Sequence, residues 1–122
     1  MLDINLNNKI ANISDLLLTP LKEITVVGGN VLHGLKASDL GYAGFGEAYF
    51  SNIEFGAIKA WKLHNKMTLN LIVPMGVIRF VVYDSRKNSS SFQKFDEVIL
   101  SRENAYRLTV PPMLWFGFQG LD

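Results

Sequence analysis

The sequence predicts a single all-β domain, built as a sandwich or a barrel. Eight short segments have the β-branched and aromatic composition of strands, and turn residues separate them at intervals of about eight to twelve positions. No segment between them has a helical pattern long enough to connect parallel strands, which argues against a parallel α/β sheet. The chain has 122 residues, of which 48% are hydrophobic, so it can build one core and has no room for a second.

The elements follow in order along the chain. Residues 1–21 are expected as an N-terminal segment in which the run Leu16-Leu17-Leu18 docks on the body of the domain. A β-branched strand at 23–27 ends at the turn Gly28-Gly29-Asn30, and residues 30–42 are expected as a loop with one helical turn at 37–39. The remaining strands are expected at 44–51, 57–63, 67–73, 77–84, 95–100, 106–110 and 114–119.

The strand at 77–84 shows the alternation of a half-buried strand. Ile78, Phe80 and Val82 share one face, which is predicted to point into the core. The other face is mixed in character and is expected to line a cavity or a subunit interface. Its members are Val77, Arg79, Val81 and Tyr83.

Charge and cysteine content exclude several functions. The net charge is +1, with 12 basic and 11 acidic residues, so nothing in the charge balance predicts nucleic acid or an anionic membrane as a partner. The chain contains no cysteine, which excludes disulfides, thiolate metal sites and a cysteine nucleophile, and fits a reducing cytoplasm.

Residues 1–8 lack the pattern of a signal peptide, and the longest apolar runs are too short to span a bilayer.

Several motifs resemble those of one enzyme family. Residues 83–95 (YDSRKNSSSFQKF), 99–104 (ILSREN), 107–112 (RLTVPP) and 117–118 (GF) are similar to the motifs VDLRKGSPTFGKW and LSAEN…LxIPPGFAHGF of the dTDP-4-dehydrorhamnose 3,5-epimerases. Upstream, residues 44–50 (GFGEAYF) resemble the family's GFFFE, and Leu63-His64 lies where the family has RGLH. The resemblance implies a dimeric cupin (jelly-roll) barrel that acts on a nucleotide-linked 4-keto-6-deoxy sugar in surface polysaccharide biosynthesis, without a cofactor.

The resemblance makes His64 the candidate general base. A proton beside a ketone can be removed by a base near neutral pKa, and a cation or hydrogen-bond donor then holds the enolate. The side chains expected to bind the substrate are Lys59, Lys62, Lys66, Glu47, Asn70 and Trp115. Asn70 is polar within an apolar strand, so it is expected either to hydrogen-bond within the barrel or to face its contents.

Three positions depart from the family pattern. Trp61 stands where the family has an arginine, Leu69 where it has a lysine, and Phe116 where it has a histidine. The family's acidic tyrosine and the aspartate that pairs with its base lie beyond the GF motif, so Tyr83 is the tentative acid within this chain. The alternatives for the acid are Tyr49 and Tyr106, although each of these tyrosines is also typical of a packed aromatic.

Two further expectations concern metals and partners. His33 and His64 are the only histidines, and the His-x-His pair of metal-binding cupins is missing, so no metal site is expected. A barrel without its final strand would have an open edge that dimerisation or strand exchange could cover, so a homodimer is expected. Because several family positions differ, the alternative function is a non-catalytic cupin that binds a sugar nucleotide or a partner protein.

Overall fold

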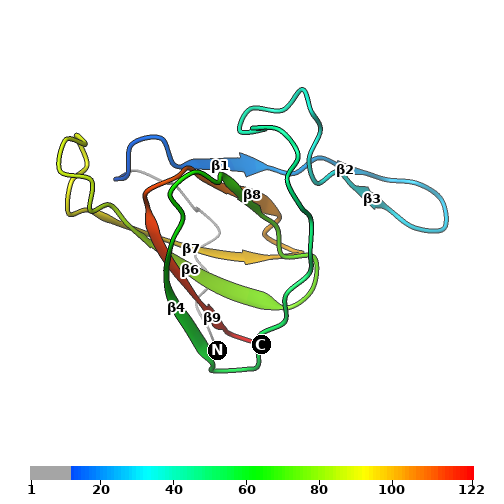
Figure 1. The fold of residues 1–122 in the computed structure, drawn as a ribbon. Helices are drawn as coiled ribbons and strands as arrows, with labels where there is room; N and C mark the ends of the chain where they lie inside the picture. The colour runs from blue at the N-terminus through cyan, green and yellow to red at the C-terminus, as the bar shows by residue number, and fades with distance from the viewer. Residues whose placement is uncertain (1–11) are drawn as a thin grey trace.

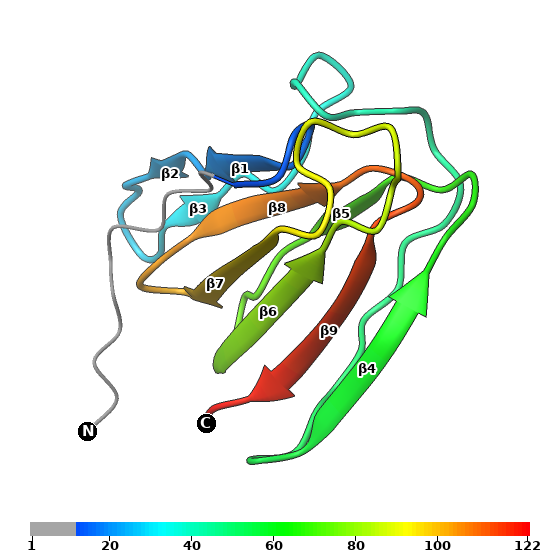
Figure 2. The same cartoon turned by 90° about the vertical axis from the view of Figure 1, so that its left-hand side faces the viewer.

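The structure, a computed structural model, describes residues 12–122, which form two larger antiparallel sheets and one short hairpin (Figure 1). The first sheet has the order β1-β8-β5, with strands Leu17–Pro20, Tyr106–Val110 and Leu69–Leu71. The second has the order β4-β9-β6-β7, with strands Ile58–Leu63, Trp115–Gly120, Val77–Tyr83 and Phe95–Ser101 (Figure 2). The hairpin pairs β2 (Glu23–Ile24) with β3 (Val31–Leu32) and projects from the larger sheets. The all-β prediction is confirmed.

The core lies between the two larger sheets. On β6, Phe80 and Val82 are buried while Arg79 and Val81 are only partly buried, as the alternation predicts. The apolar side chains of the core are Ile13, Leu16, Val73, Phe80, Val82, Val98, Leu100, Leu108, Val110, Leu114 and Phe116. We call the face of the four-stranded sheet that carries Phe80, Val82 and Phe116 the inner face, and the opposite face the outer face.

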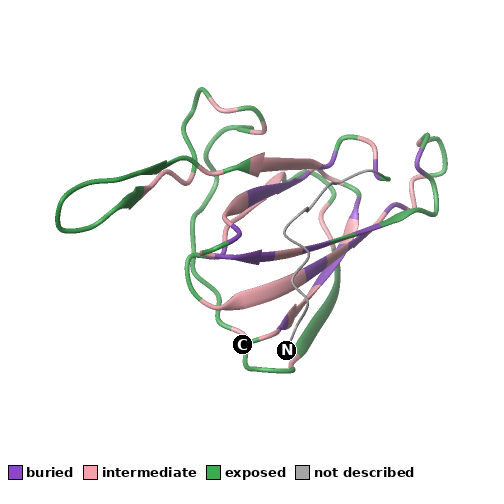
Figure 3. Ribbon diagram, turned by 180° about the vertical axis from the view of Figure 1, so that it is seen from behind, coloured by how far each residue is buried: buried purple, intermediate pink, exposed green. Residues whose placement is uncertain are grey.

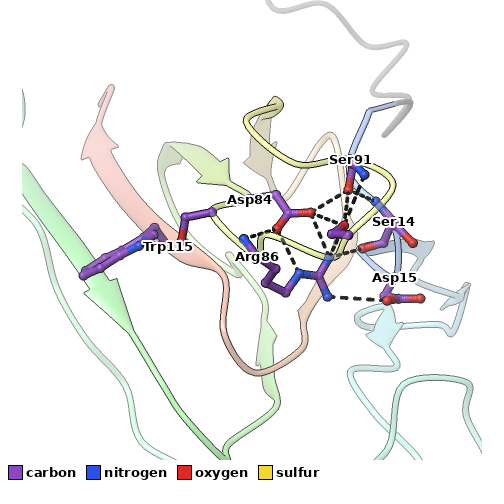
Figure 4. A network of polar contacts seen from close by, with 8 residues as sticks. Ser14, Asp15, Asp84, Arg86, Ser91 and Trp115 are labelled. Carbon is purple, nitrogen blue, oxygen red and sulfur yellow. Dashed lines mark hydrogen bonds and ion pairs between the residues drawn. The ribbon is translucent and has the colours of Figure 1, made fainter.

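A buried carboxylate organises the loop between β6 and β7. Asp84 is fully buried and accepts two hydrogen bonds from the Arg86 guanidinium, at 2.9 Å from Nε and 3.0 Å from Nη2 (Figure 4). The hydroxyls of Ser89 and Ser91 each donate to Asp84 Oδ2 at 2.6 Å. The Arg86 guanidinium, followed by the two serine hydroxyls, holds the pKa of Asp84 far below its ordinary range.

The same network fixes the segment that precedes β1. Arg86 Nη2 donates to the carbonyl of Ser14 at 3.1 Å, and the Ser14 N–H donates to Ser91 Oγ at 2.8 Å. Nearby, the buried Asp96 accepts from the N–H of Ile13 at 2.7 Å. These bonds place Leu16 in the core and bring β1 beside β8.

A buried arginine holds the loop after β3. Arg107 on β8 is 2% exposed and donates to the carbonyls of Gly34 at 2.7 Å and Leu40 at 3.2 Å. Its guanidinium also lies 3.5 Å from Asp39. Residues 36–42, which lie within the expected loop, therefore cover the side of β8 that faces away from the core.

Several expected elements differ from the structure. Residues 44–51 form no strand and have no ladder partner among the described residues, and Phe45, Tyr49 and Phe50 are strongly exposed. Gly44 has φ of 88°, a left-handed conformation that interrupts an extended strand. The strand expected at 67–73 is shortened to β5, and β1 and β3 form in segments expected as irregular.

The close approach of β4 to β9 depends on a glycine. A Cβ atom at Gly117 would lie 2.6 Å from the Cβ of Ala60 and 3.3 Å from the backbone of β4. We expect Gly117→Ala to lower the free energy of unfolding by about 1–3 kcal/mol, because β4 must move away from its partner. Gly46→Ala is the control, since nothing lies within 4 Å of its Cβ. Urea unfolding of both variants checks this, and equal effects would contradict it.

Candidate active site

The inner face near the end of β4 carries His64. In antiparallel pairs the two facing residues share one side of the sheet, and Lys62 of β4 faces Phe116 of β9. Phe116 also faces Val82 of β6 and belongs to the core. The imidazole of His64, partly buried, lies with its centroid 5.9 Å from the ring of Phe116 and is tilted by 34°. His64 is therefore on the inner face, at the end of the barrel where β4 finishes.

A β-bulge brings two lysines to the same face as His64. Lys59 and Lys62 are three positions apart, which would put them on opposite faces of a regular strand. The register of β4 against β9 shifts between them, so Lys59 faces Phe118 and Lys62 faces Phe116. Both lysines are exposed, and Lys59 Nζ donates to the carbonyl of Asn52 at 3.1 Å. The inner face of β4 thus combines two ammonium groups with one imidazole.

The turn between β8 and β9 fixes the backbone of His64. The N–H of Met113 donates to the carbonyl of His64 at 2.7 Å. Met113 has φ of 72°, and the next residue, Leu114, is 1% exposed and anchors the turn in the core. Sequence reasoning missed this contact, although Pro111-Pro112 indicated the rigid turn that makes it.

Tyr83 and Trp115 lie on the outer face, which corrects their expected roles. Tyr83 faces Trp115 across the β6–β9 ladder and stacks on Phe95, with ring centroids 4.5 Å apart. Together with Trp61 these side chains line a pocket of about 400 Å³. The sheet separates this pocket from His64, so Tyr83 cannot serve as the acid opposite His64 in the same barrel, and Trp115 cannot line the space that His64 faces.

Asn70 is engaged on the far side of the other sheet. Its carboxamide oxygen accepts from the Thr109 hydroxyl at 2.6 Å, and its nitrogen donates to the carbonyl of Gly41 at 3.1 Å. Leu69 and Leu71, its neighbours on β5, pack against the core, so Asn70 points away from the barrel interior. Of the two expected alternatives for Asn70, the structure shows hydrogen bonding within the protein, to Thr109 of β8 and to the covering loop at residue 41.

The other expected binding residues, Glu47 and Lys66, are exposed. Glu47 lies on residues 44–51, and Lys66 lies in the turn after His64. Of the remaining tyrosines considered as acids, Tyr49 is 71% exposed and Tyr106 packs against the core. Leu69, at the position of the family's lysine, also packs against the core.

The described part of the chain has neither a cluster of metal-ligating side chains nor a membrane-spanning helix. In residues 12–122, no three His, Cys, Asp or Glu side chains lie close enough together to hold a metal ion. The same residues contain no helix with the length and apolar character needed to cross a membrane.

The chain is similar to solved structures of sugar-nucleotide enzymes. A dTDP sugar isomerase from Desulfovibrio desulfuricans G20 is 36% identical, with a TM-score of 0.86 over 92% of this chain and 72% of that protein. A dTDP-4-dehydrorhamnose 3,5-epimerase from Sulfolobus tokodaii is 27% identical, with a TM-score of 0.77 over 88% of this chain and 64% of that protein.

Comparison with curated proteins gives a shorter match, and no protein-family model matches the sequence. A probable low-salt glycan biosynthesis epimerase of Haloferax volcanii is 25% identical over 75 residues. These residues are 61% of this chain and 48% of that relative, so the match spans about half the length of the curated relative. The identity, the coverage and the all-β architecture together show that the chain is a cupin and belongs to the dTDP-4-dehydrorhamnose 3,5-epimerase family of sugar-nucleotide epimerases and isomerases.

Proposed function

We propose that this protein is an epimerase or isomerase of a nucleotide-linked 4-keto-6-deoxy sugar, with His64 as the general base. The observation that carries the proposal is the joint placement of His64, Lys59 and Lys62 on the inner face of β4. A partly buried imidazole can accept a carbon-bound proton, and ammonium groups on the same face can hold negative charge. The relatives named above are a dTDP sugar isomerase, a dTDP-4-dehydrorhamnose 3,5-epimerase and a probable glycan biosynthesis epimerase, which supports the same proposal.

The proposed chemistry is a proton transfer beside the ketone. His64 removes the proton from the carbon next to C4, and the electron pair of that C–H bond moves into the carbonyl to form an enolate. Lys62 or Lys59 stabilises the enolate oxygen or the diphosphate of the substrate as a point charge. For epimerisation, a proton then returns to the same carbon from the opposite side of the enolate plane. For ketoisomerisation, the proton of the C3 hydroxyl moves to the C4 oxygen and a proton is added to C4, so that the ketone moves to C3.

We further propose that the protein acts in the cytoplasm as a homodimer and that its product enters the biosynthesis of lipopolysaccharide or another surface polysaccharide. The absence of cysteine is consistent with a reducing compartment. The edge strand β4 is exposed over most of its length, which favours association with a second copy (Figure 3). The glycan-biosynthesis relative supports the assignment to a polysaccharide pathway.

Solvent exchange tests the proposed activity. The protein is incubated in deuterated water with dTDP-4-keto-6-deoxyglucose, and proton NMR follows the signals beside the ketone. Loss of the signal at C3 or C5 is the expected result and identifies the carbon attacked. Binding of the ligand without any exchange above the protein-free rate would overturn the enzyme proposal and favour the alternative, a non-catalytic cupin that binds sugar nucleotides.

A further inference from the structure

The phenyl ring of Phe116 packs against the imidazole of His64 on the inner face. The two ring centroids are 5.9 Å apart and the ring planes are tilted by 34°. Phe116 is 5% exposed and stands on β9, where it faces Lys62 of β4 on one side and Val82 of β6 on the other. A ring packed between two neighbouring strands and the core has little freedom to move. Phe116 therefore gives His64 a fixed aromatic neighbour, at a position where the family pattern has a histidine.

The positive charges near His64 oppose the step that its proposed role requires. When the imidazole takes a proton from carbon it becomes an imidazolium cation, and Lys62 lies two positions before it on the same face. The bulge brings Lys59 to that face as well, and Lys66 follows two positions after His64. Like charges close by disfavour a further positive charge. An interaction that favours the imidazolium over the neutral imidazole would therefore lower the barrier to proton transfer.

We propose that Phe116 is a positioning residue, which holds the His64 ring and stabilises its imidazolium form through the π face of the phenyl ring. The proposal rests on the assignment of His64 as the general base. The face of an aromatic ring is electronegative and attracts a cation that lies within about 6 Å of its centroid. The attraction is stronger where the ring is shielded from water, as Phe116 is. Neutral imidazole gains much less from the ring, so the interaction strengthens as the proton is transferred.

Fluorination of the Phe116 ring tests this role. Each fluorine withdraws electron density from the π face and weakens its attraction for a cation, while the ring keeps nearly the same shape. Monofluoro-, difluoro- and trifluorophenylalanine are placed at residue 116 of the full chain by amber suppression, and proton NMR follows deuterium incorporation beside the ketone of dTDP-4-keto-6-deoxyglucose. We expect the rate at saturating substrate to fall with each added fluorine, by about three- to tenfold in total. The KM for the substrate and the free energy of unfolding in urea should stay at their wild-type values, because neither depends on the imidazolium.

The same series at Phe118 is the matched control. Phe118 lies two positions further along β9, and its ring packs on Phe80 with centroids 5.8 Å apart, at a tilt of 41°. Fluorination there should leave the exchange rate unchanged. A rate that does not respond to fluorine at residue 116, or that falls equally in both series, would overturn the role of Phe116 and leave His64 and the exchange activity standing. Failure of the wild-type protein to exchange would overturn the proposed function, and this role with it.

Discussion

His64→Gln should lower the rate of proton exchange beside the substrate ketone by about 10² to 10⁴, the range expected for loss of a general base. Glutamine keeps a polar side chain of similar length against Phe116, but its amide is not basic and cannot take a carbon-bound proton. The hydrogen bond from the Met113 N–H to the His64 carbonyl does not involve the His64 side chain. The geometry at the end of β4 should therefore be retained. The rate of deuterium incorporation from solvent, followed by proton NMR, checks the prediction.

His33→Gln is the matched control, because His33 is the other histidine of the chain. It follows β3 and is held through its backbone N–H to the carbonyl of Lys22 at 2.9 Å, far along the chain from β4. This variant should exchange at the wild-type rate. Titration with dTDP should give similar affinities for both variants and the wild type. Equal exchange by the His64 variant and the wild type would exclude His64 as the base and leave the activity itself standing.

The fold could be predicted where alternation was strong. Residues 77–84, 95–100, 106–110 and 114–119 correspond closely to strands β6 to β9, because each alternates between core and surface or lies wholly within the core. Residues 44–51 have aromatic side chains typical of a strand, but a strand also needs a neighbour to pair with, and local composition carries no information about that neighbour. β1 is the opposite case. Its leucine run shows no alternation, but it forms a strand because it can pair with β8.

The site could be predicted only in part for a similar reason. The motif at Leu63-His64 identified the candidate base, but the face on which each side chain lies depends on register. The bulge between Lys59 and Lys62 brings both to the inner face, and nothing in the local sequence marks that bulge. Tyr83 illustrates the converse, because the alternation of 77–84 already placed it opposite Phe80 and Val82. The alternation of side chains along the strand therefore predicted the face on which Tyr83 lies, whereas the acidity of its hydroxyl did not.

The largest stability effect is expected at Asp84. Asp84→Asn removes the charge that pairs with Arg86 and leaves one acceptor oxygen where there were two, so either Arg86 Nε or the Ser89 and Ser91 hydroxyls face an amide NH2 group instead of an acceptor. Breaking a buried ion pair on one side costs about 3–5 kcal/mol, and we expect a loss of about 3 kcal/mol because Arg86 keeps some access to water. Urea unfolding monitored by circular dichroism measures it. The matched control is Asp15→Asn, which removes an exposed carboxylate 3.5 Å from the same guanidinium and should cost less than about 1 kcal/mol.

The pH dependence of stability gives an independent signature of the same carboxylate. Because Arg86 and the two serines hold the pKa of Asp84 below its ordinary value of 3.8, the unfolded chain binds this proton more readily than the native protein. The contribution of Asp84 is therefore complete above about pH 5 and is lost as the pH falls through 3.8 toward the native pKa. We expect the free energy of unfolding to fall less steeply between about pH 5 and pH 2 in Asp84→Asn than in the wild type or in Asp15→Asn. Parallel slopes in all three proteins would mean that another carboxylate dominates acid unfolding and that the bonds to Arg86 contribute little to the native state.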